Sequence, residues 1–190
     1  MKTRNFKGIS LEDLAFAVSD HLAGNGINAV LTGGACVSLY TKNEYLSFDL
    51  DFVLISFEKK PRLRATMEAL GFRLESGFFK HRDTPFFVEF LPPPPSVGEE
   101  PVKNISTLGK NGLRLKLLSP TDCVKDRLAA FYHWNDRSCL EQALLVSRAQ
   151  AVDLEEVRRW SGRENQDEKF AVFRSRLKEN PANPKAGRRG

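Results

Sequence analysis

The stretch that decides the fold is VLTGGACVSLYTKNEYLSFDLDFVLI, residues 30–55. It opens in an apolar run, turns at Gly33-Gly34 and continues as a helix-length segment. After a polar connection it enters Asp49-Leu50-Asp51 and a second apolar run. Short apolar runs on either side of a helix-length segment are typical of buried strands joined through a helix. We therefore expect strand, helix and strand, with the two aspartates at the start of the second strand.

Asp49 and Asp51 form a pair of carboxylates on one face of that second strand. Side chains alternate along an extended chain, so the two residues point the same way, roughly 7 Å apart at the backbone. Two carboxylates at the end of a buried strand repel each other and lose hydration unless a cation lies between them. Oxygen ligands favour a hard cation, and Mg²⁺ is the first choice.

Gly33 and Gly34 add a second feature to the same stretch. Without a Cβ, the backbone can turn sharply into the helix and expose the N–H groups of its first turn, where a phosphate binds favourably. A phosphate cradle beside a metal-binding carboxylate pair describes a site for phosphoryl or nucleotidyl transfer. The alternative is a plain strand-to-helix turn followed by two solvated aspartates.

Glu89 is the one acid in the aromatic and β-branched run from Thr84 to Leu91. Both faces of a strand with this sequence are apolar, so an unpaired carboxylate there is costly. If this strand lies beside the aspartate strand, Glu89 completes a three-carboxylate cluster able to hold two Mg²⁺ ions about 3.5–4 Å apart. The alternative is a solvent-facing glutamate on an edge strand.

Gly-Gly followed at a short interval by Asp-x-Asp resembles the nucleotidyltransferase superfamily that includes DNA polymerase β, and more narrowly its AbiEii-like toxin branch. The resemblance covers roughly Leu31 to Leu145. It implies a Mg²⁺-dependent transfer of a nucleoside monophosphate from an NTP substrate to an acceptor, with two ions bound. The branch also implies RNA, such as tRNA, as the acceptor, and a toxin role with a cognate antitoxin protein as a partner.

The resemblance implies roles for the residues of the glycine and aspartate motif. Asp49, Asp51 and Glu89 would be the metal ligands, and Glu89 could also act as the base near the attacking hydroxyl. The triphosphate would be bound by three residues of the turn and its helix: Gly33, Gly34 and Ser38.

Two further candidates come from the helical segment after Ser119. The AbiEii-like branch carries a lysine on a first helix and an aspartate shortly after it, and Lys125 and Asp136 match those places. A small shift of this match along the helix would make Arg127 the contact to the leaving pyrophosphate instead of Lys125. The alternative for all three is a solvated face with internal ion pairs.

A second class of function is a catalytically inactive nucleotidyltransferase-fold module that binds nucleotide, RNA or a protein partner. The intact Asp49/Asp51 pair argues against it, because a site relieved of metal chemistry has no reason to keep two repelling acids. A plain interaction protein is a third interpretation, and it predicts no Mg²⁺-dependent nucleotide binding.

The order of the elements favours an α/β (α+β) fold with a small mixed β-sheet flanked by helices and a helical C-terminal part. Helix starts are predicted after Ser10, Ser119 and Asp153, and Asn111-Gly112 predicts a hairpin. We expect a nucleotidyltransferase-like core over residues 1–118, a helical part packed on it over 119–180, and a disordered basic tail over 181–190.

Composition and charge limit the setting in which the chain works. The formal net charge is +5, and a surplus of that size lies from Arg174 onward. A basic end attracts nucleic-acid phosphates, and it equally fits a solubilising tail. No apolar run approaches the roughly 20 residues of a membrane span, and the N-terminus lacks the apolar centre of a signal peptide. We expect a cytoplasmic protein with no membrane partner.

The three widely spaced cysteines argue against a disulfide framework and a zinc site: Cys36, Cys123 and Cys139.

Overall fold

The computed structural model describes residues 5–179, so the tail predicted at 181–190 lies outside the described residues. Its main feature is a seven-stranded mixed sheet made of β1 (Ala29–Thr32), β2 (Asp49–Leu54), β3 (Arg73–Glu75), β4 (Phe78–Lys80), β5 (Phe87–Leu91), β8 (Ile105–Lys110) and β9 (Leu113–Leu118). A separate small hairpin consists of β6 (Ser96–Val97) and β7 (Glu100–Pro101).

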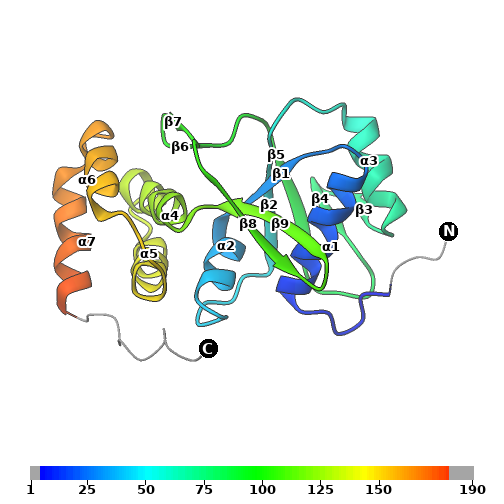
Figure 1. The fold of residues 1–190 in the computed structure, drawn as a ribbon, viewed down its shortest axis with the longest axis horizontal. Helices are drawn as coiled ribbons and strands as arrows, with labels where there is room; N and C mark the ends of the chain where they lie inside the picture. The colour runs from blue at the N-terminus through cyan, green and yellow to red at the C-terminus, as the bar shows by residue number, and fades with distance from the viewer. Residues whose placement is uncertain (1–4, 180–190) are drawn as a thin grey trace.

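Helices surround the sheet and form the C-terminal part. Three of them alternate with the first strands: α1 (Leu11–Gly24), α2 (Gly33–Tyr40) and α3 (Lys60–Ala69). The others follow the sheet: α4 (Pro120–Trp134), α5 (Arg137–Ala149), α6 (Leu154–Arg163) and α7 (Asp167–Glu179). In Figure 1 these later helices gather on the left, and the sheet with α1 and α3 lies on the right. The predicted fold class, a mixed sheet flanked by helices with a helical C-terminal part, is confirmed.

The strand order is β3-β4-β5-β2-β1-β9-β8. Strand β2 runs antiparallel to β1 and parallel to β5, and β9 runs parallel to β1. As a result, the end of β1 and the starts of β2 and β5 meet at one end of the sheet. Strand β5 lies inside the sheet, between β4 and β2, so the alternative that placed Glu89 on an edge strand is wrong.

Local sequence signals explain where several elements begin. Ser10 caps α1 by accepting a hydrogen bond from the Asp13 N–H, and Ser119 caps α4 in the same way from the Asp122 N–H. Asn111 and Gly112 both have positive φ, as a tight turn between β8 and β9 requires. These three predictions are confirmed.

Other boundaries differ from the expectations by a few residues. Strand β5 begins at Phe87 rather than at Thr84, because the chain before it is held by local bonds such as that from the Phe86 N–H to the Thr84 hydroxyl. The short hairpin β6–β7 follows directly after four consecutive prolines, residues 92–95. It is held against α6 by the hydrogen bond that the Trp160 indole N–H donates to the Val97 carbonyl.

One apolar core runs through both the sheet and the helices. It includes Leu50, Phe52 and Val88 of the sheet and continues to Trp160 and Phe173 of the C-terminal helices. Trp160, Phe170 and Phe173 of the last two helices are buried in this core. Within residues 5–179, no helix combines the length and apolar character needed to cross a membrane.

Candidate active site

Three carboxylates lie on one face of the sheet, at the end where β1 finishes and β2 and β5 begin. Asp51 pairs with Thr32 of β1 on one side and with Glu89 of β5 on the other, and Asp49 is two residues earlier on β2. Cross-strand partners point to the same face of a sheet, as do residues two apart on a strand. We call this side of the sheet the carboxylate face.

Gly33 makes room for the Asp51 carboxylate. The residue opens α2 with φ +66°, and a Cβ placed on it would overlap Asp51 Oδ2 and lie 3.2 Å from Asp51 Cγ. The glycine is therefore required twice, for its backbone conformation and for the close approach of the acid. Gly34 accommodates the polar connection instead, because its Cβ would lie 3.0 Å from Ser47 Oγ and 3.2 Å from Tyr45 Cε1.

Ser38 lies beneath the site and is completely buried. Its hydroxyl donates to the Gly34 carbonyl at 3.2 Å and accepts from the Ser47 N–H at 3.0 Å. The Ser47 hydroxyl in turn donates a short hydrogen bond to Asp49 Oδ1. Ser38 therefore supports the loop that carries Asp49, and it reaches the site only through these bonds.

The electrostatics of the site centre on Asp51. Burial, followed by the negative charges of Asp49 and Glu89, raises the pKa of Asp51 from its ordinary value of 3.8 to about 7. The positive charge of Arg127 acts in the opposite direction on the same carboxyl. The site thus concentrates more negative charge than the nearby cation neutralises.

Arg127 is the cation of α4 that faces this site. Its guanidinium donates two hydrogen bonds to Asp126 Oδ2, at 3.0 and 2.6 Å, and a longer one to Cys139 Sγ. Tyr45 belongs to the same group of residues, because burial and then the charge of Asp49 raise the pKa of its phenol, with Arg127 opposing them. Sequence reasoning missed Tyr45, Ser47 and Asp126. The only available signal was proximity in sequence. Asp126 is next to Arg127, and Tyr45 and Ser47 lie in the polar connection shortly before Asp49.

Lys125 lies on a different side of α4. Its ammonium group is buried between Asp122 Oδ1 at 2.9 Å and Glu156 Oε1 at 3.1 Å. It lines a cavity of about 390 Å³ to which Asp49, Asp51 and Glu89 do not contribute. The structure therefore brings Arg127, and not Lys125, toward the three carboxylates.

Asp136 caps the N-terminus of α5. Its Oδ1 accepts hydrogen bonds from the Ser138 N–H at 2.8 Å and the Cys139 N–H at 3.2 Å. Its charge also acts on the Tyr45 phenol, although less than that of Asp49. Asp136 therefore lies close to Tyr45 and Arg127, and its carboxylate is already engaged in capping α5.

The donor set on the carboxylate face fits a hard divalent cation in its chemistry. All three side chains offer oxygen, and the half-buried Asp51 lies over the space that Gly33 leaves open. Among residues 5–179, however, no three His, Cys, Asp or Glu side chains converge closely enough to hold a metal ion. The hydrogen bond from Ser47 holds Asp49 Oδ1 within the loop. The residues fit a metal by type and by face, with Asp49 turned toward Ser47.

Comparison with solved structures defines the class of fold. The chain has the fold of nucleotidyltransferase-like proteins. One of them is an antigenic nucleotidyltransferase-like protein from Paracoccidioides brasiliensis, with a TM-score of 0.58 and 16% identity over 74% of this chain and 76% of that chain. Another is the antibiotic-resistance factor ANT(2'')-Ia, with a TM-score of 0.52 and 15% identity over 89% and 94% of the two chains.

A second structure of ANT(2'')-Ia, in complex with adenylyl-2''-tobramycin, matches with a TM-score of 0.48 and 15% identity over 87% of this chain and 97% of that chain. No protein-family model matches the chain, and no curated protein matches it in sequence. The likeness at these identities shows the fold and leaves the reaction to be argued from the site.

Proposed function

We propose that this protein is a divalent-cation-dependent nucleotidyltransferase, which moves a nucleoside monophosphate from an NTP to a hydroxyl of an acceptor. The observation that carries the proposal is the half-buried Asp51, seated over Gly33 with Asp49 and Glu89 on the same face and Arg127 nearby. Carboxylates that repel one another beside the glycine turn are costly for folding, and they are useful for binding a metal-bound triphosphate.

Each group in the proposed site has a chemical task. Asp49, Asp51 and Glu89 would hold Mg²⁺, which would supply neutralisation of charge on the triphosphate and polarisation of the α-phosphoryl group. The acceptor oxygen attacks the α-phosphorus, the bond from that phosphorus to the β-phosphate oxygen breaks, and pyrophosphate leaves. Glu89 takes the proton of the attacking hydroxyl. Arg127 offsets the negative charge that develops on the leaving pyrophosphate.

The other candidate residues support this arrangement. Gly33 and Gly34 lie at the first turn of α2, whose N–H groups a triphosphate would approach. Ser38 positions the loop of Asp49 through Ser47. We assign Asp136 a positioning role through the start of α5. Lys125 would act on the site only indirectly, through the packing of α4 on α6.

We further propose an AbiEii-like branch, with RNA such as tRNA as the acceptor and a toxin role opposed by a cognate antitoxin. This part of the proposal rests on the spacing of Gly33-Gly34, Asp49 and Asp51, and on the helical Lys125 and Asp136. ANT(2'')-Ia, whose complex contains adenylyl-2''-tobramycin, shares the fold at 15% identity, so its acceptor does not define the acceptor of this chain.

A nucleotide-binding module without turnover is the second candidate. It is favoured by the bond that turns Asp49 toward Ser47 and by the lack of a converged metal cluster among the described residues. Such a module would bind nucleotide with Asp51→Asn as well as, or better than, with the native acid, because the amide removes a repelling charge.

The test is the transfer of label from each α-³²P NTP to total cellular RNA or to protein in the presence of Mg²⁺. We expect transfer with the wild type and at least a hundredfold less with Asp49→Asn and Asp51→Asn. Asp20→Asn, a carboxylate change on α1, is the matched control and should keep full transfer. If no NTP gives transfer while calorimetry still shows nucleotide binding, the binding module replaces the enzyme.

A further inference from the structure

A single row of paired residues leads from the carboxylates to the β3 edge of the sheet. Asp49 pairs with Phe87, Phe87 pairs with Lys80, and Lys80 pairs with Arg73. Paired residues on adjacent strands share a face, so all four side chains belong to the carboxylate face. Strands are spaced about 4.8 Å apart, which puts the backbones of Lys80 and Arg73 about 10 and 14 Å from that of Asp49.

Aromatic rings occupy the part of the row nearest the acids. Phe87 is half-buried, and its ring meets that of Phe78 edge to face, with centroids 5.1 Å apart. Just beyond the end of the strands, the Phe48 ring is 61% exposed and lies 6.2 Å from the ring of Phe86. The Phe87 N–H donates to the Phe48 carbonyl, which holds the two chain segments side by side. Rings that remain accessible at this end of a sheet offer flat surfaces to a ligand.

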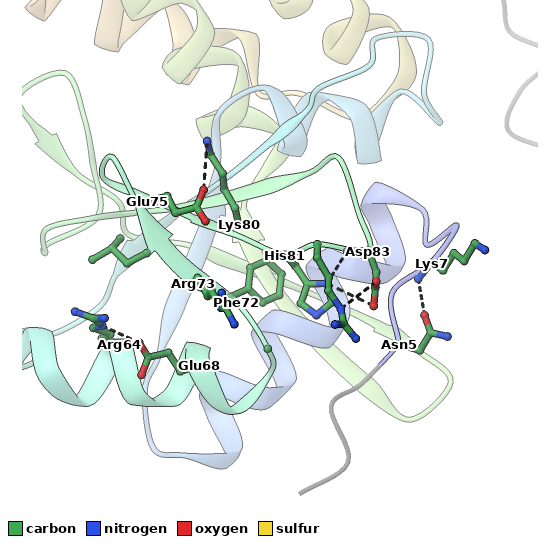
Figure 2. A pocket seen from close by; sticks show the side chains of 13 residues that line it. Asn5, Lys7, Arg64, Glu68, Phe72, Arg73, Glu75, Lys80, His81 and Asp83 are labelled. Carbon is green, nitrogen blue, oxygen red and sulfur yellow. Dashed lines mark hydrogen bonds and ion pairs between the residues drawn. The ribbon is translucent and has the colours of Figure 1, made fainter.

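The far part of the row is basic and opens into a groove. The groove has a volume of about 1290 Å³. Figure 2 shows the side chains that line it, among them Arg73, Lys80, Lys7 and Arg64. Acids are present as well: Glu68 pairs with Arg64 at 2.8 Å, Asp83 with Arg82 at 3.5 Å, and Glu75 reaches Lys80 only at 4.0 Å. Within residues 5–179, no acid lies at ion-pair distance from Arg73 or Lys7, and the side chains of Arg73 and Lys80 are exposed.

We propose that Phe78, Phe87, Lys80 and Arg73, named here the aromatic-basic strip, bind a single-stranded nucleic acid as the acceptor. Bases would stack on the rings and phosphates would contact the two cations, which brings a hydroxyl of the strand to the carboxylates. A polycationic acceptor is disfavoured by the same two charges, and a duplex cannot present its bases to the rings. This inference rests on the proposed function for the reaction, but the strip would bind the strand without any turnover.

The test is equilibrium binding of a short, fluorescein-labelled, single-stranded RNA of mixed sequence to the full-length protein, measured by anisotropy without NTP or Mg²⁺. Lys80→Gln with Arg73→Gln should lower the salt slope of log K by about 1.4, at about 0.7 per phosphate contact on single strands. Phe87→Leu, which keeps the apolar bulk but loses the flat ring, should weaken binding roughly fivefold or more.

The charge-matched control is Arg114→Gln with Lys60→Gln. Both residues are exposed. Arg114 lies on β9, where it pairs with Gly109 of β8, and β9 meets β1 three residues further on, at Leu117 and Leu31. Strand β1 therefore separates Arg114 from the strands of the aromatic-basic strip. This double variant should leave RNA binding within about twofold of the wild type. Both double variants carry surface changes, so circular dichroism should show the native fold in each.

The inference is overturned if the strip variants bind RNA as the wild type does, or if a duplex of the same sequence binds as tightly as the single strand. It is also overturned if the wild type does not bind RNA. Transfer of label to RNA, protein or a small molecule is scored separately. If the protein transfers label and the strip variants bind RNA as the wild type does, the strip proposal is rejected and the transferase proposal stands. If RNA binds at the strip and no label is transferred, only the transferase proposal is rejected.

Discussion

At the scale of single residues, the site depends on one glycine and one acid that need each other. Gly33 adopts φ +66°, and the space its missing Cβ leaves is filled by the Asp51 carboxylate. The spacing of the two residues in the sequence predicted a shared site. The reason given for the glycine was incomplete. Gly33 was expected to make room for a phosphate, and the space left by its missing Cβ holds the Asp51 carboxylate instead.

We predict that Gly33→Ala damages the site beyond the cost of its backbone strain. A positive φ costs a residue with a Cβ about 1–2 kcal/mol. Gly112→Ala is the matched control, since Gly112 has φ +79° with no atom within 4 Å of an added Cβ. Urea denaturation should show a larger loss for Gly33→Ala, and calorimetry should show weakened Mg²⁺–NTP binding in that variant alone. Equal losses in both, with native nucleotide affinity, would contradict the close approach of Asp51.

In metal-free protein, the Asp51 carboxyl should become increasingly destabilising as the pH rises from about 4 to about 7. The folded-state pKa of Asp51 is raised to about 7 from the ordinary 3.8, so the native state binds more protons than the unfolded chain in this window. The loss attributable to Asp51 should be about 1–2 kcal/mol after allowance for partial exposure to solvent. Denaturant unfolding in EDTA at a series of pH values measures it. Asp51→Asn should flatten this part of the curve, and an unchanged slope in that variant would reject the raised pKa.

At the scale of elements, α4 presents two ionic groups on different sides. Lys125 and the buried Tyr132 share a helical stripe, and the Tyr132 ring stacks on Trp160 of α6 with centroids 5.5 Å apart. That packing directs Lys125 to Glu156 and leaves Arg127 toward the carboxylates. The sequence left Lys125 and Arg127 as alternatives for the contact to the pyrophosphate, and helical spacing alone could not separate them. It could not predict which stripe faces the sheet, because the choice depends on α6, whose position is set by contacts distant in sequence.

The two basic residues of α4 should respond differently to substitution. Lys125→Met leaves Asp122 buried without its partner and should cost about 3 kcal/mol of stability. Its folded form should bind NTP almost as the wild type does. Arg127→Gln should instead weaken triphosphate binding about tenfold, the equivalent of one charge-assisted hydrogen bond. Denaturation and calorimetry on both variants measure the two effects, and a fall in NTP affinity confined to Lys125→Met would reverse the assignment.

At the scale of the whole molecule, one core joins the sheet and the C-terminal helices. The sequence indicated the individual strands and helices. It raised the placement of β5 beside β2 only as the condition under which Glu89 joins the site, and it did not indicate that the two strands are parallel. The order β3-β4-β5-β2-β1-β9-β8 depends on pairings between segments far apart in the chain, and local patterns carry little information about them. The division between residues 118 and 119 coincides with the step from β9 to α4 and stays a prediction about domains.

Trp160 should be important to the stability of the whole chain, and Trp134 should not. Trp160 is fully buried and binds the Val97 carbonyl of the β6–β7 hairpin, whereas Trp134 is 76% exposed. Trp160→Ala should cost about 3–5 kcal/mol. Trp134→Ala should change stability by less than about 0.5 kcal/mol. Denaturation followed by far-ultraviolet circular dichroism compares them, and equal midpoints would contradict a shared core.

The carboxylate face as a metal-dependent nucleotide site is tested most directly by a crystal structure with Mn²⁺ and a non-hydrolysable NTP analogue. Anomalous scattering locates the metal independently of any assumed geometry. We predict a Mn²⁺ peak bound by Asp49 and Asp51, with Asp49 released from Ser47, and the triphosphate between Gly33-Gly34 and Arg127. A nucleotide bound elsewhere, or bound here without any anomalous peak between the two aspartates, would contradict the proposed chemistry.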